Sequence, residues 1–322
     1  MRLLVSAGGS GGHVYPALTV IQALARWYNN DTSNESLLPG DNRTERLKVL
    51  FIGGKGRVEA TLVQREGLPF VGIQAGGLVG LGPLSMLRNA GKLGIGLVQA
   101  WQWVRRFRPD VLLLTGGYVG MPVALAAWAQ QVPALVYVPD VEPAISVKVM
   151  ARFVQRVAVN VPSSRSFFAK GKTVVTGYPV RSTLKVVGQP VARARLGLEA
   201  DRMTLLVVGG SQGARSINRA VAVILEKLLE MCQVIHISGP ADFDEMQARQ
   251  AMLPALLRSR YHLYDYLYDE MGDALAAADL VLSRSGASTL GELPHFGLPS
   301  VLVPYPYAWH YQRVNADYLV EQ

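Results

Sequence analysis

Short apolar runs alternate with longer amphipathic segments along most of the chain. The spacing of apolar positions over residues 16–27 and 214–231 predicts amphipathic helices there. The apolar runs are rich in Val, Ile and Leu, which is typical of parallel strands covered by helices on both faces. The pattern therefore predicts an α/β fold with strands at 3–7, 49–52, 69–73, 111–114, 134–138, 157–159, 173–175, 204–208, 233–237, 262–266, 280–282 and 300–303. Residues 29–45 are polar and are expected to form a surface insertion.

One segment near the start of the chain is repeated weakly in its second half. LLVSAGGSGGHVYPA begins at Leu3, and LLVVGGSQGARSINRA begins at Leu205. Each reads as a strand, a glycine turn and a helix, which is how a Rossmann-type domain opens. The repeat predicts two Rossmann-like, doubly wound domains that face a cleft. A Gly/Pro hinge at residues 177–179 places the boundary so that the domains span 1–178 and 179–322.

Two features of the charge distribution change this picture. Residues 111–139 carry no charge, but glycines and prolines interrupt the run, so a buried β-α-β unit is favoured over a membrane span. The net charge is +8, and no acid lies between Glu66 and Asp110. That stretch is basic, apolar and rich in tryptophan, which fits an anionic membrane surface; a core helix with a solvated basic end is the alternative. No nucleic-acid-binding motif accompanies it, so no nucleic acid partner is expected.

The glycine loops are candidate phosphate sites. A glycine turn followed by a helix directs free backbone N–H groups at an anion, although such turns also occur for structural reasons. Neither loop matches the dinucleotide pattern G-x-G-x-x-G, and no G-x-x-x-x-G-K-[ST] is present, which disfavours dehydrogenases and kinases. A third turn at 283–289 precedes Glu292, an acid that could bind ribose hydroxyls or simply favour a helix dipole. Arg181 and Ser211 are candidate diphosphate donors.

A metal-dependent reaction is disfavoured. Asp242 and Asp244 have the spacing of a DxD metal site, but they fall in the first turn of a predicted helix, where acids favour the dipole. We therefore expect neither a metal nor a cofactor.

Six segments in order resemble the landmarks of the MurG family: GGSGGHVYPAL, RPDVLLLTGGYVGMP, VTGYPVR, VVGGSQGARSIN, DLVLSRSGASTLGEL and GLPSVLVPYPY. The resemblance implies the GT-B glycosyltransferase architecture. It implies an inverting hexosyltransferase of peptidoglycan biosynthesis, which transfers N-acetylglucosamine from UDP-N-acetylglucosamine to lipid I and gives lipid II. It also implies a peripheral protein on the cytoplasmic face of the cell membrane, with a role in cell shape and division. Membrane attachment would use residues 79–108.

The resemblance implies roles for individual residues. His13 would be the catalytic base, although a histidine after a glycine turn can also be a capping or packing residue. Acceptor-binding positions would be Gly9, Ser10, Gly11, Gly12 and Tyr118. Donor-binding positions would be Arg181, Ser211, Gln212, Glu292, Gln312 and Asn315.

The sequence departs from the family pattern at four places, one of which is the replacement of more polar neighbours of Gln312 by Trp309, His310 and Tyr311. Residues 138–142 replace a His-Glu-Gln-Asn run, so the role of Asp140 is open between binding a sugar hydroxyl and acting near the acceptor. Pro294 is expected to interrupt the helix after Glu292. The chain ends at Gln322, inside a predicted helix, which predicts a truncated second domain. The competing hypotheses are a nucleotide-sugar 2-epimerase of the same fold and a non-catalytic UDP-sugar-binding fragment.

Overall fold

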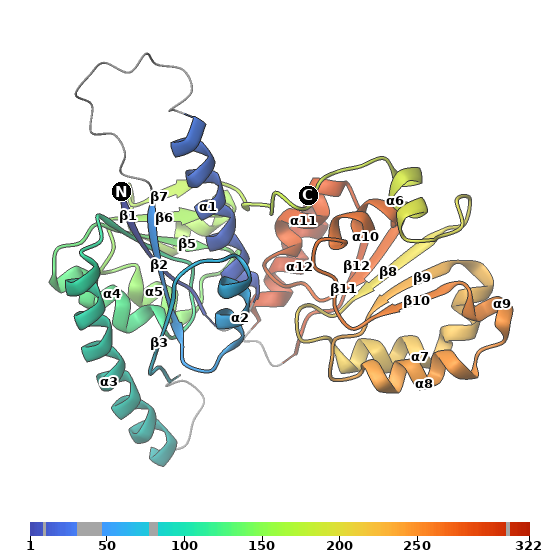
Figure 1. The fold of residues 1–322 in the computed structure, drawn as a ribbon, viewed down its shortest axis with the longest axis horizontal. Helices are drawn as coiled ribbons and strands as arrows, with labels where there is room; N and C mark the ends of the chain where they lie inside the picture. Colours follow the sequence, from blue (N-terminus) through green and yellow to red (C-terminus); the bar gives the residue numbers. More distant parts are fainter. Residues whose placement is uncertain (9–10, 31–46, 77–82, 307–309) are drawn as a thin grey trace. The chain divides into compact units, whose positions relative to one another are not determined.

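The chain forms two compact units, Met1–Pro179 and Val180–Gln322, shown in Figure 1. The structure is a computed structural model that describes residues 1–8, 11–30, 47–76, 83–306 and 310–322.

The first unit contains a seven-stranded parallel sheet with the strand order β3-β2-β1-β4-β5-β6-β7. Its strands are β1 (Arg2–Ser6), β2 (Lys48–Gly54), β3 (Phe70–Ile73), β4 (Val111–Leu114), β5 (Ala134–Val138), β6 (Arg156–Val159) and β7 (Thr173–Val175). Its helices are α1 (Gly11–Asn30), α2 (Val58–Arg65), α3 (Pro83–Phe107), α4 (Gly120–Ala129), α5 (Ile145–Met150) and the short 3₁₀ helix η1 (Pro162–Phe167). The order reverses between β1 and β4, which is where ligands bind in folds of this type.

Alternation along the strands builds a core on each face of this sheet. Leu3 and Val5 of β1 pack with residues of α1 and α2, whereas Leu4 packs with residues of α3, α4 and α5. Successive side chains of a strand point to opposite faces, so an uninterrupted apolar run buries both of them. This explains why the strands lack a polar face.

The second unit contains a five-stranded parallel sheet with the order β10-β9-β8-β11-β12. Its strands are β8 (Thr204–Val208), β9 (Gln233–Ile237), β10 (Tyr261–Tyr264), β11 (Leu280–Ser283) and β12 (Ser300–Leu302). Its helices are α6 (Gln189–Arg195), α7 (Arg215–Met231), α8 (Phe243–Met252), α9 (Ala255–Arg258), α10 (Met271–Ala277), α11 (Thr289–Phe296) and α12 (Tyr311–Glu321). Val207 packs under α7, and Leu206 packs on the opposite face with residues of α6 and α10.

All twelve predicted strands are present, each within two residues of its predicted ends. The uncharged stretch 111–139 forms β4, α4 and β5 as predicted. Within the described residues, no helix combines the length and apolar character that a membrane span requires. Residues 31–45 of the predicted insertion lie outside the described residues.

Two helix predictions need correction. Helix α1 begins at Gly11 rather than at residue 16, so Pro16 lies inside the helix instead of at its start. Pro294 does not interrupt α11, which continues to Phe296 and ends where Gly297 adopts the left-handed conformation (φ 62°). Glycine in that conformation is a common helix end, and the N–H of Leu298 donates to Leu293 O at 3.1 Å.

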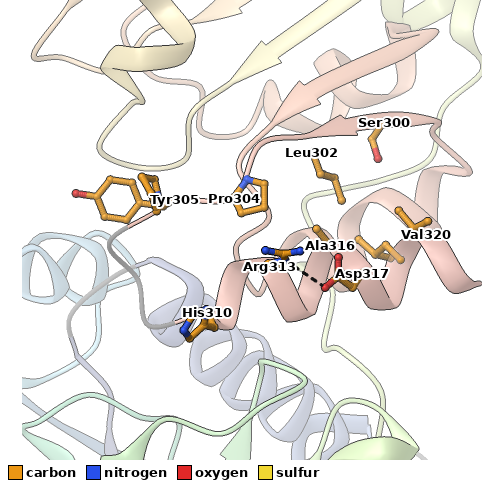
Figure 2. A pocket seen from close by; sticks show the side chains of 11 residues that line it. Ser300, Leu302, Pro304, Tyr305, His310, Arg313, Ala316, Asp317 and Val320 are labelled. Atoms are coloured by element: carbon orange, nitrogen blue, oxygen red, sulfur yellow. Dashed lines mark ion pairs between the residues drawn. The ribbon is translucent and has the colours of Figure 1, made fainter.

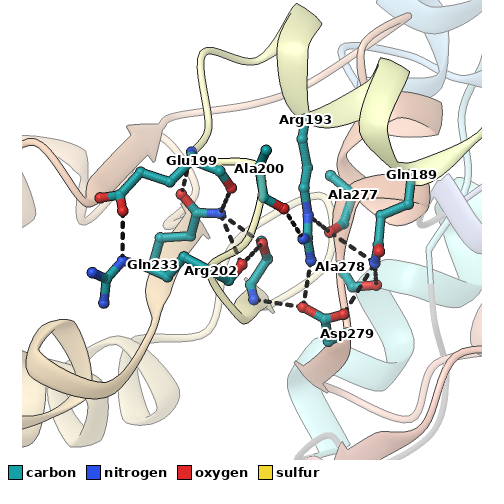
Figure 3. Close-up of polar contacts among 10 residues, drawn as sticks. Gln189, Arg193, Glu199, Ala200, Arg202, Gln233, Ala277, Ala278 and Asp279 are labelled. Atoms are coloured by element: carbon teal, nitrogen blue, oxygen red, sulfur yellow. Dashed lines mark hydrogen bonds and ion pairs between the residues drawn. The ribbon is translucent and has the colours of Figure 1, made fainter.

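A buried polar network fastens α6 to the amino-terminal ends of β8 and β11 (Figure 3). Arg193 donates to Asp279 Oδ2 at 2.6 Å and to two backbone carbonyls. The same carboxylate accepts the N–H of Thr204 at 2.7 Å and the side-chain amide of Gln189 at 3.0 Å. Arg193 is buried, so its charge depends on Asp279 for compensation.

We expect Arg193→Ala to lower the free energy of unfolding of the second unit by about 3 to 5 kcal/mol, since the variant leaves the Asp279 carboxylate without its charged partner. Urea denaturation of the full chain, with hydrogen exchange of the β8 and β11 peptides, measures this loss. The control is Arg195→Ala on the same helix, whose ion pair to Asp273 involves a side chain that is 55% exposed and should contribute about 1 kcal/mol or less. Equal effects of the two substitutions would contradict this account.

Candidate functional site

In the first unit, the predicted residues around His13 are gathered where β1 and β4 end. We call His13, Asp140, Glu59 and the glycine turn 116–117 the His13 cluster. The hydroxyl of Thr115 donates to His13 O at 2.6 Å and holds the first turn of α1 against the end of β4. Gly9 and Ser10 lie outside the described residues, whereas Gly11 and Gly12 are the first residues of α1. The backbone N–H groups at a helix start can bind an anion.

The glycine turn after β4 packs directly on His13. Gly116 (φ 115°) has no room for a side chain, because a Cβ there would lie 2.5 Å from His13 Cδ2 and 2.9 Å from Nε2. At Gly117 (φ 83°) a Cβ would lie 2.4 Å from Gly8 O. The two loops are about 100 residues apart in the sequence. They can meet only because both positions are glycine. Tyr118, the next residue, is exposed.

Burial and two carboxylates act on the His13 ring in opposite directions. Burial lowers the pKa of His13 below its ordinary value, and the negative charges of Asp140 and Glu59 oppose that shift. The net direction is downward, so the imidazole is neutral near pH 7 and can accept a proton. Asp140 sits in a fixed segment: Asn160 donates to Pro139 O at 3.0 Å and Ser164 to Val141 O at 2.6 Å.

In the second unit, two predicted donor residues contact each other. Arg181 Nη2 lies 3.1 Å from Glu292 Oε1, and both side chains are largely buried. Burial raises the pKa of Glu292, while the Arg181 guanidinium opposes the rise. We call this pair, with the glycine turn 209–214 and the turn 283–289, the Glu292 cluster. Sequence reasoning named both residues but did not predict their ion pair.

The second glycine loop is a tight turn between β8 and α7. Gly210 (φ 90°) and Gly213 (φ 74°) both have left-handed backbones, and a Cβ at Gly213 would lie 2.2 Å from Ser238 O. Ser211 is half-buried and Gln212 is exposed at the tip of the turn. The turn therefore leaves these two side chains accessible while its glycines pack against the end of β9.

Helix α12 turns two predicted residues toward the turn 283–289. Asn315 is fully buried and its amide donates to Ser285 O at 3.1 Å. Gln312 accepts the hydroxyl of Ser285 through its backbone oxygen at 2.6 Å, and its Oε1 accepts the N–H of Tyr305 at 2.9 Å. These contacts position the turn; binding of a sugar by Gln312 and Asn315 stays a prediction.

The opposite face of α12 lines a hollow of about 820 Å³ beside the edge strand β12 (Figure 2). Arg313, Asp317 and Val320 face it from the helix, and Ser300 and Leu302 face it from the strand. None of the predicted site residues lines this hollow. It is therefore distinct from the Glu292 cluster.

A polar network lies behind the second glycine loop. Asp242 accepts from Arg215 Nε and from the amide of Asn218, both at 2.9 Å. Asn218 also contacts the buried His236, which lies 2.7 Å from the hydroxyl of Tyr261. Asp242 thus holds the start of α7. This structural role explains the presence of one of the two acids that form the DxD spacing. Within the described ranges, no group of three His, Cys, Asp or Glu side chains could hold a metal.

The burial of His236 predicts a pH-dependent stability. Burial lowers its pKa from 6.5 to about 4, although the charge of Asp242 opposes the shift. Between these values the unfolded chain binds the proton more readily than the folded chain, so stability is complete above about pH 6.5 and falls as the pH drops toward 4. The expected loss is about 2 to 3 kcal/mol at about pH 4.5.

Urea denaturation at about pH 7 and about pH 4.5 measures this loss, with His236→Gln as the non-titrating comparison. The wild-type chain should lose more stability than the variant over this interval. An identical loss in both proteins would contradict the prediction.

The fold of both units is shared with known proteins. Two parallel Rossmann-like sheets, each with a glycine turn after its first strand, define the α/β architecture of the GT-B glycosyltransferases. Residues 42–159 match the glycosyltransferase family 28 N-terminal domain, and residues 204–322 match the glycosyltransferase family 28 C-terminal domain. The whole chain is 42% identical to the UDP-N-acetylglucosamine–N-acetylmuramyl-(pentapeptide) pyrophosphoryl-undecaprenol N-acetylglucosamine transferase of Roseiflexus sp. and covers 81% of it. The chain belongs to the MurG family of glycosyltransferases.

Two solved structures show the same fold. Acinetobacter baumannii MurG matches with a TM-score of 0.65 and 24% identity over 99% of this chain and 83% of that one. A UDP-GlcNAc 2-epimerase from Neisseria meningitidis matches with a TM-score of 0.63 and 13% identity over 94% of this chain and 82% of that one. At these identities the likeness concerns the fold alone, so the epimerase likeness does not favour the epimerase hypothesis.

The site contains residues that the sequence did not single out. Glu59, Thr115, Asn160 and Ser164 act on His13 or on the segment that carries Asp140. The groups on which they act are distant from them in the sequence. Only the fold brings them together.

Proposed function

We propose that this protein transfers N-acetylglucosamine from UDP-N-acetylglucosamine to lipid I, the undecaprenyl-pyrophosphoryl acceptor, and so forms lipid II. The observation that carries the proposal is the 42% identity over the whole chain with a transferase named for this reaction. The family assignment of both halves supports it.

In this proposal the second unit, Val180–Gln322, binds the donor. The backbone N–H groups of the turn 209–214, with Ser211 and Gln212, would bind the diphosphate at the start of α7. Glu292 would accept the ribose hydroxyls, and Arg181, already beside it, would contact the diphosphate. Gln312 and Asn315 would contact the sugar from α12.

The first unit, Met1–Pro179, would bind the acceptor. The glycine loop Gly9, Ser10, Gly11 and Gly12, the last two of which begin α1, would hold the lipid diphosphate, and Tyr118 would border the acceptor. His13 is then the base: its neutral imidazole accepts the proton of the acceptor hydroxyl as that oxygen attacks C1 of the sugar. The bond from C1 to the diphosphate breaks on the opposite face, and UDP leaves with the electron pair. Asp140 would bind a hydroxyl near this base.

A transfer assay with labelled UDP-N-acetylglucosamine and a lipid I analogue tests the proposal. We expect wild-type protein to form product, and His13→Ala to lower kcat by roughly 100-fold to 10,000-fold, the usual contribution of a general base. Tyr28→Phe, on the same helix but outside the cluster, is the matched control.

The same assay separates the alternatives. Conversion of UDP-N-acetylglucosamine without any acceptor would favour a 2-epimerase. Tight UDP binding without transfer would favour a non-catalytic fragment. Normal transfer by His13→Ala would show that His13 is not the catalytic base.

We further propose that α3 docks the protein on the cytoplasmic face of the membrane. Gly96, Ala100 and Val104 bury one face of this helix. The opposite face exposes Ile95, Val98 and Trp101, with their side chains 55%, 58% and 41% accessible. Three arginines that are also exposed follow at the end of the segment: Arg105, Arg106 and Arg108. An apolar stripe beside basic residues is typical of helices that lie on anionic lipid.

A triple variant in which Ile95, Val98 and Trp101 are each replaced by Ser should lose the apolar contact. Its binding to vesicles that contain phosphatidylglycerol should fall by about tenfold or more. Co-sedimentation measures the bound fraction. Val223→Ser, which changes an even more exposed apolar residue on α7, is the control and should bind as wild type does. Unchanged binding by the triple variant would exclude α3 as the docking surface.

A further inference from the structure

The first unit contains a buried acid that the proposed reaction does not yet use. Glu59 lies in the first turn of α2, and its side chain is only 2% exposed. Its Oε1 accepts the N–H of Gly54 at 2.9 Å. Burying a carboxylate costs several kcal/mol unless it is compensated, so its presence calls for a physical reason.

Three glycines make the space that Glu59 occupies. A Cβ added at Gly8 or at Gly54 would lie 3.0 Å from Glu59 Oε1, and a Cβ added at Gly53 would lie 2.8 Å from Glu59 Cγ. These glycines come from the ends of β1 and β2, which are neighbours in the sheet. The carboxyl group is therefore seated in a slot at the end of β1, the strand that leads to His13.

Glu59 and Asp140 follow different strands of the sheet that carries His13. In the order β2-β1-β4-β5, Glu59 follows β2 and Asp140 follows β5, while His13 follows β1. The negative charges of both act on the His13 ring, and both favour its protonated form. Burial acts against that form, so the two carboxylates offset part of the cost of placing a positive charge there.

We infer that Glu59 is a positioning residue for catalysis: seated in the glycine slot, its carboxylate stabilises the imidazolium that forms when His13 accepts the proton of the acceptor hydroxyl. This inference rests on the proposed function. The O–H bond of the acceptor breaks, its proton goes to the imidazole, its oxygen bonds to C1 of the sugar, and UDP departs with the electron pair. Glu59 takes no proton itself, and the imidazolium later releases its proton to solvent.

Glu59→Gln separates this role from a structural one. Glutamine has nearly the same shape and can still accept the Gly54 N–H, but it lacks the charge. We expect kcat to fall by roughly tenfold or more, with KM for UDP-N-acetylglucosamine unchanged. The acid limb of the kcat–pH profile should move to lower pH, because one of the two charges that favour protonated His13 is gone. Glu66→Gln, an exposed acid just beyond α2, is the control and should keep the wild-type rate and profile.

A second readout does not depend on turnover. The chain has five histidines, so the ring signal that is missing from His13→Ala assigns His13 in a proton NMR titration. Glu59→Gln should titrate His13 at a lower pH than wild type. If Glu59→Gln does not fold, Glu59→Asp, which withdraws the charge by one methylene, should still lower kcat at an unchanged KM.

The outcomes are distinguishable. A wild-type chain that transfers no sugar contradicts the proposed function, whatever Glu59 does. A wild-type chain that transfers sugar, together with a folded Glu59→Gln variant that keeps both kcat and the His13 titration, overturns the inference alone.

Discussion

In both units, the backbones of two loops pack directly against each other at the carboxyl ends of the strands. The candidate sites depend on this close contact. In the first unit a Cβ at Gly117 would fall on the carbonyl of Gly8, and in the second a Cβ at Gly239 would lie 2.5 Å from the Cα of Gly213. Loops with side chains at these positions could not come so close. Because parallel strands end at one edge of a sheet, these contacts hold loops from distant parts of the chain at a single place.

Close packing at these edges buries ionisable groups, and each lies beside a polar or charged group that acts on it. Asp140 and Glu59 act on His13, Arg181 contacts Glu292, and Arg215 and Asn218 contact Asp242. A buried charge without a partner would destabilise the fold, whereas a buried charge beside a polar or charged partner is tolerated and still acts on nearby groups. The same arrangement therefore stabilises the loops and sets the protonation of groups that would take part in transfer.

The sequence predicted the strands well because buried parallel strands leave a direct trace, a run of Val, Ile and Leu between turns. It also named His13, Arg181 and Glu292, because they lie in or beside segments that resemble the landmarks of a known family. It did not predict the start of α1, because that turn contains glycines and is followed by Pro16, and both residue types have low helix propensity. Nor did it single out Glu59, because an acid in the first turn of a helix looks like an ordinary partner of the helix dipole. Its role depends on three glycines that only the folded chain brings around it.

The contact between His13 and Gly116 has a consequence for how this family can vary. The imidazole fills the volume that a side chain at position 116 would need, so the two positions are not independent. A lineage that acquires alanine or serine at 116 must displace the ring or the turn, even before the cost of the positive φ. Position 116 should therefore stay glycine wherever histidine is kept at position 13, and it should become variable first in relatives that have lost the histidine.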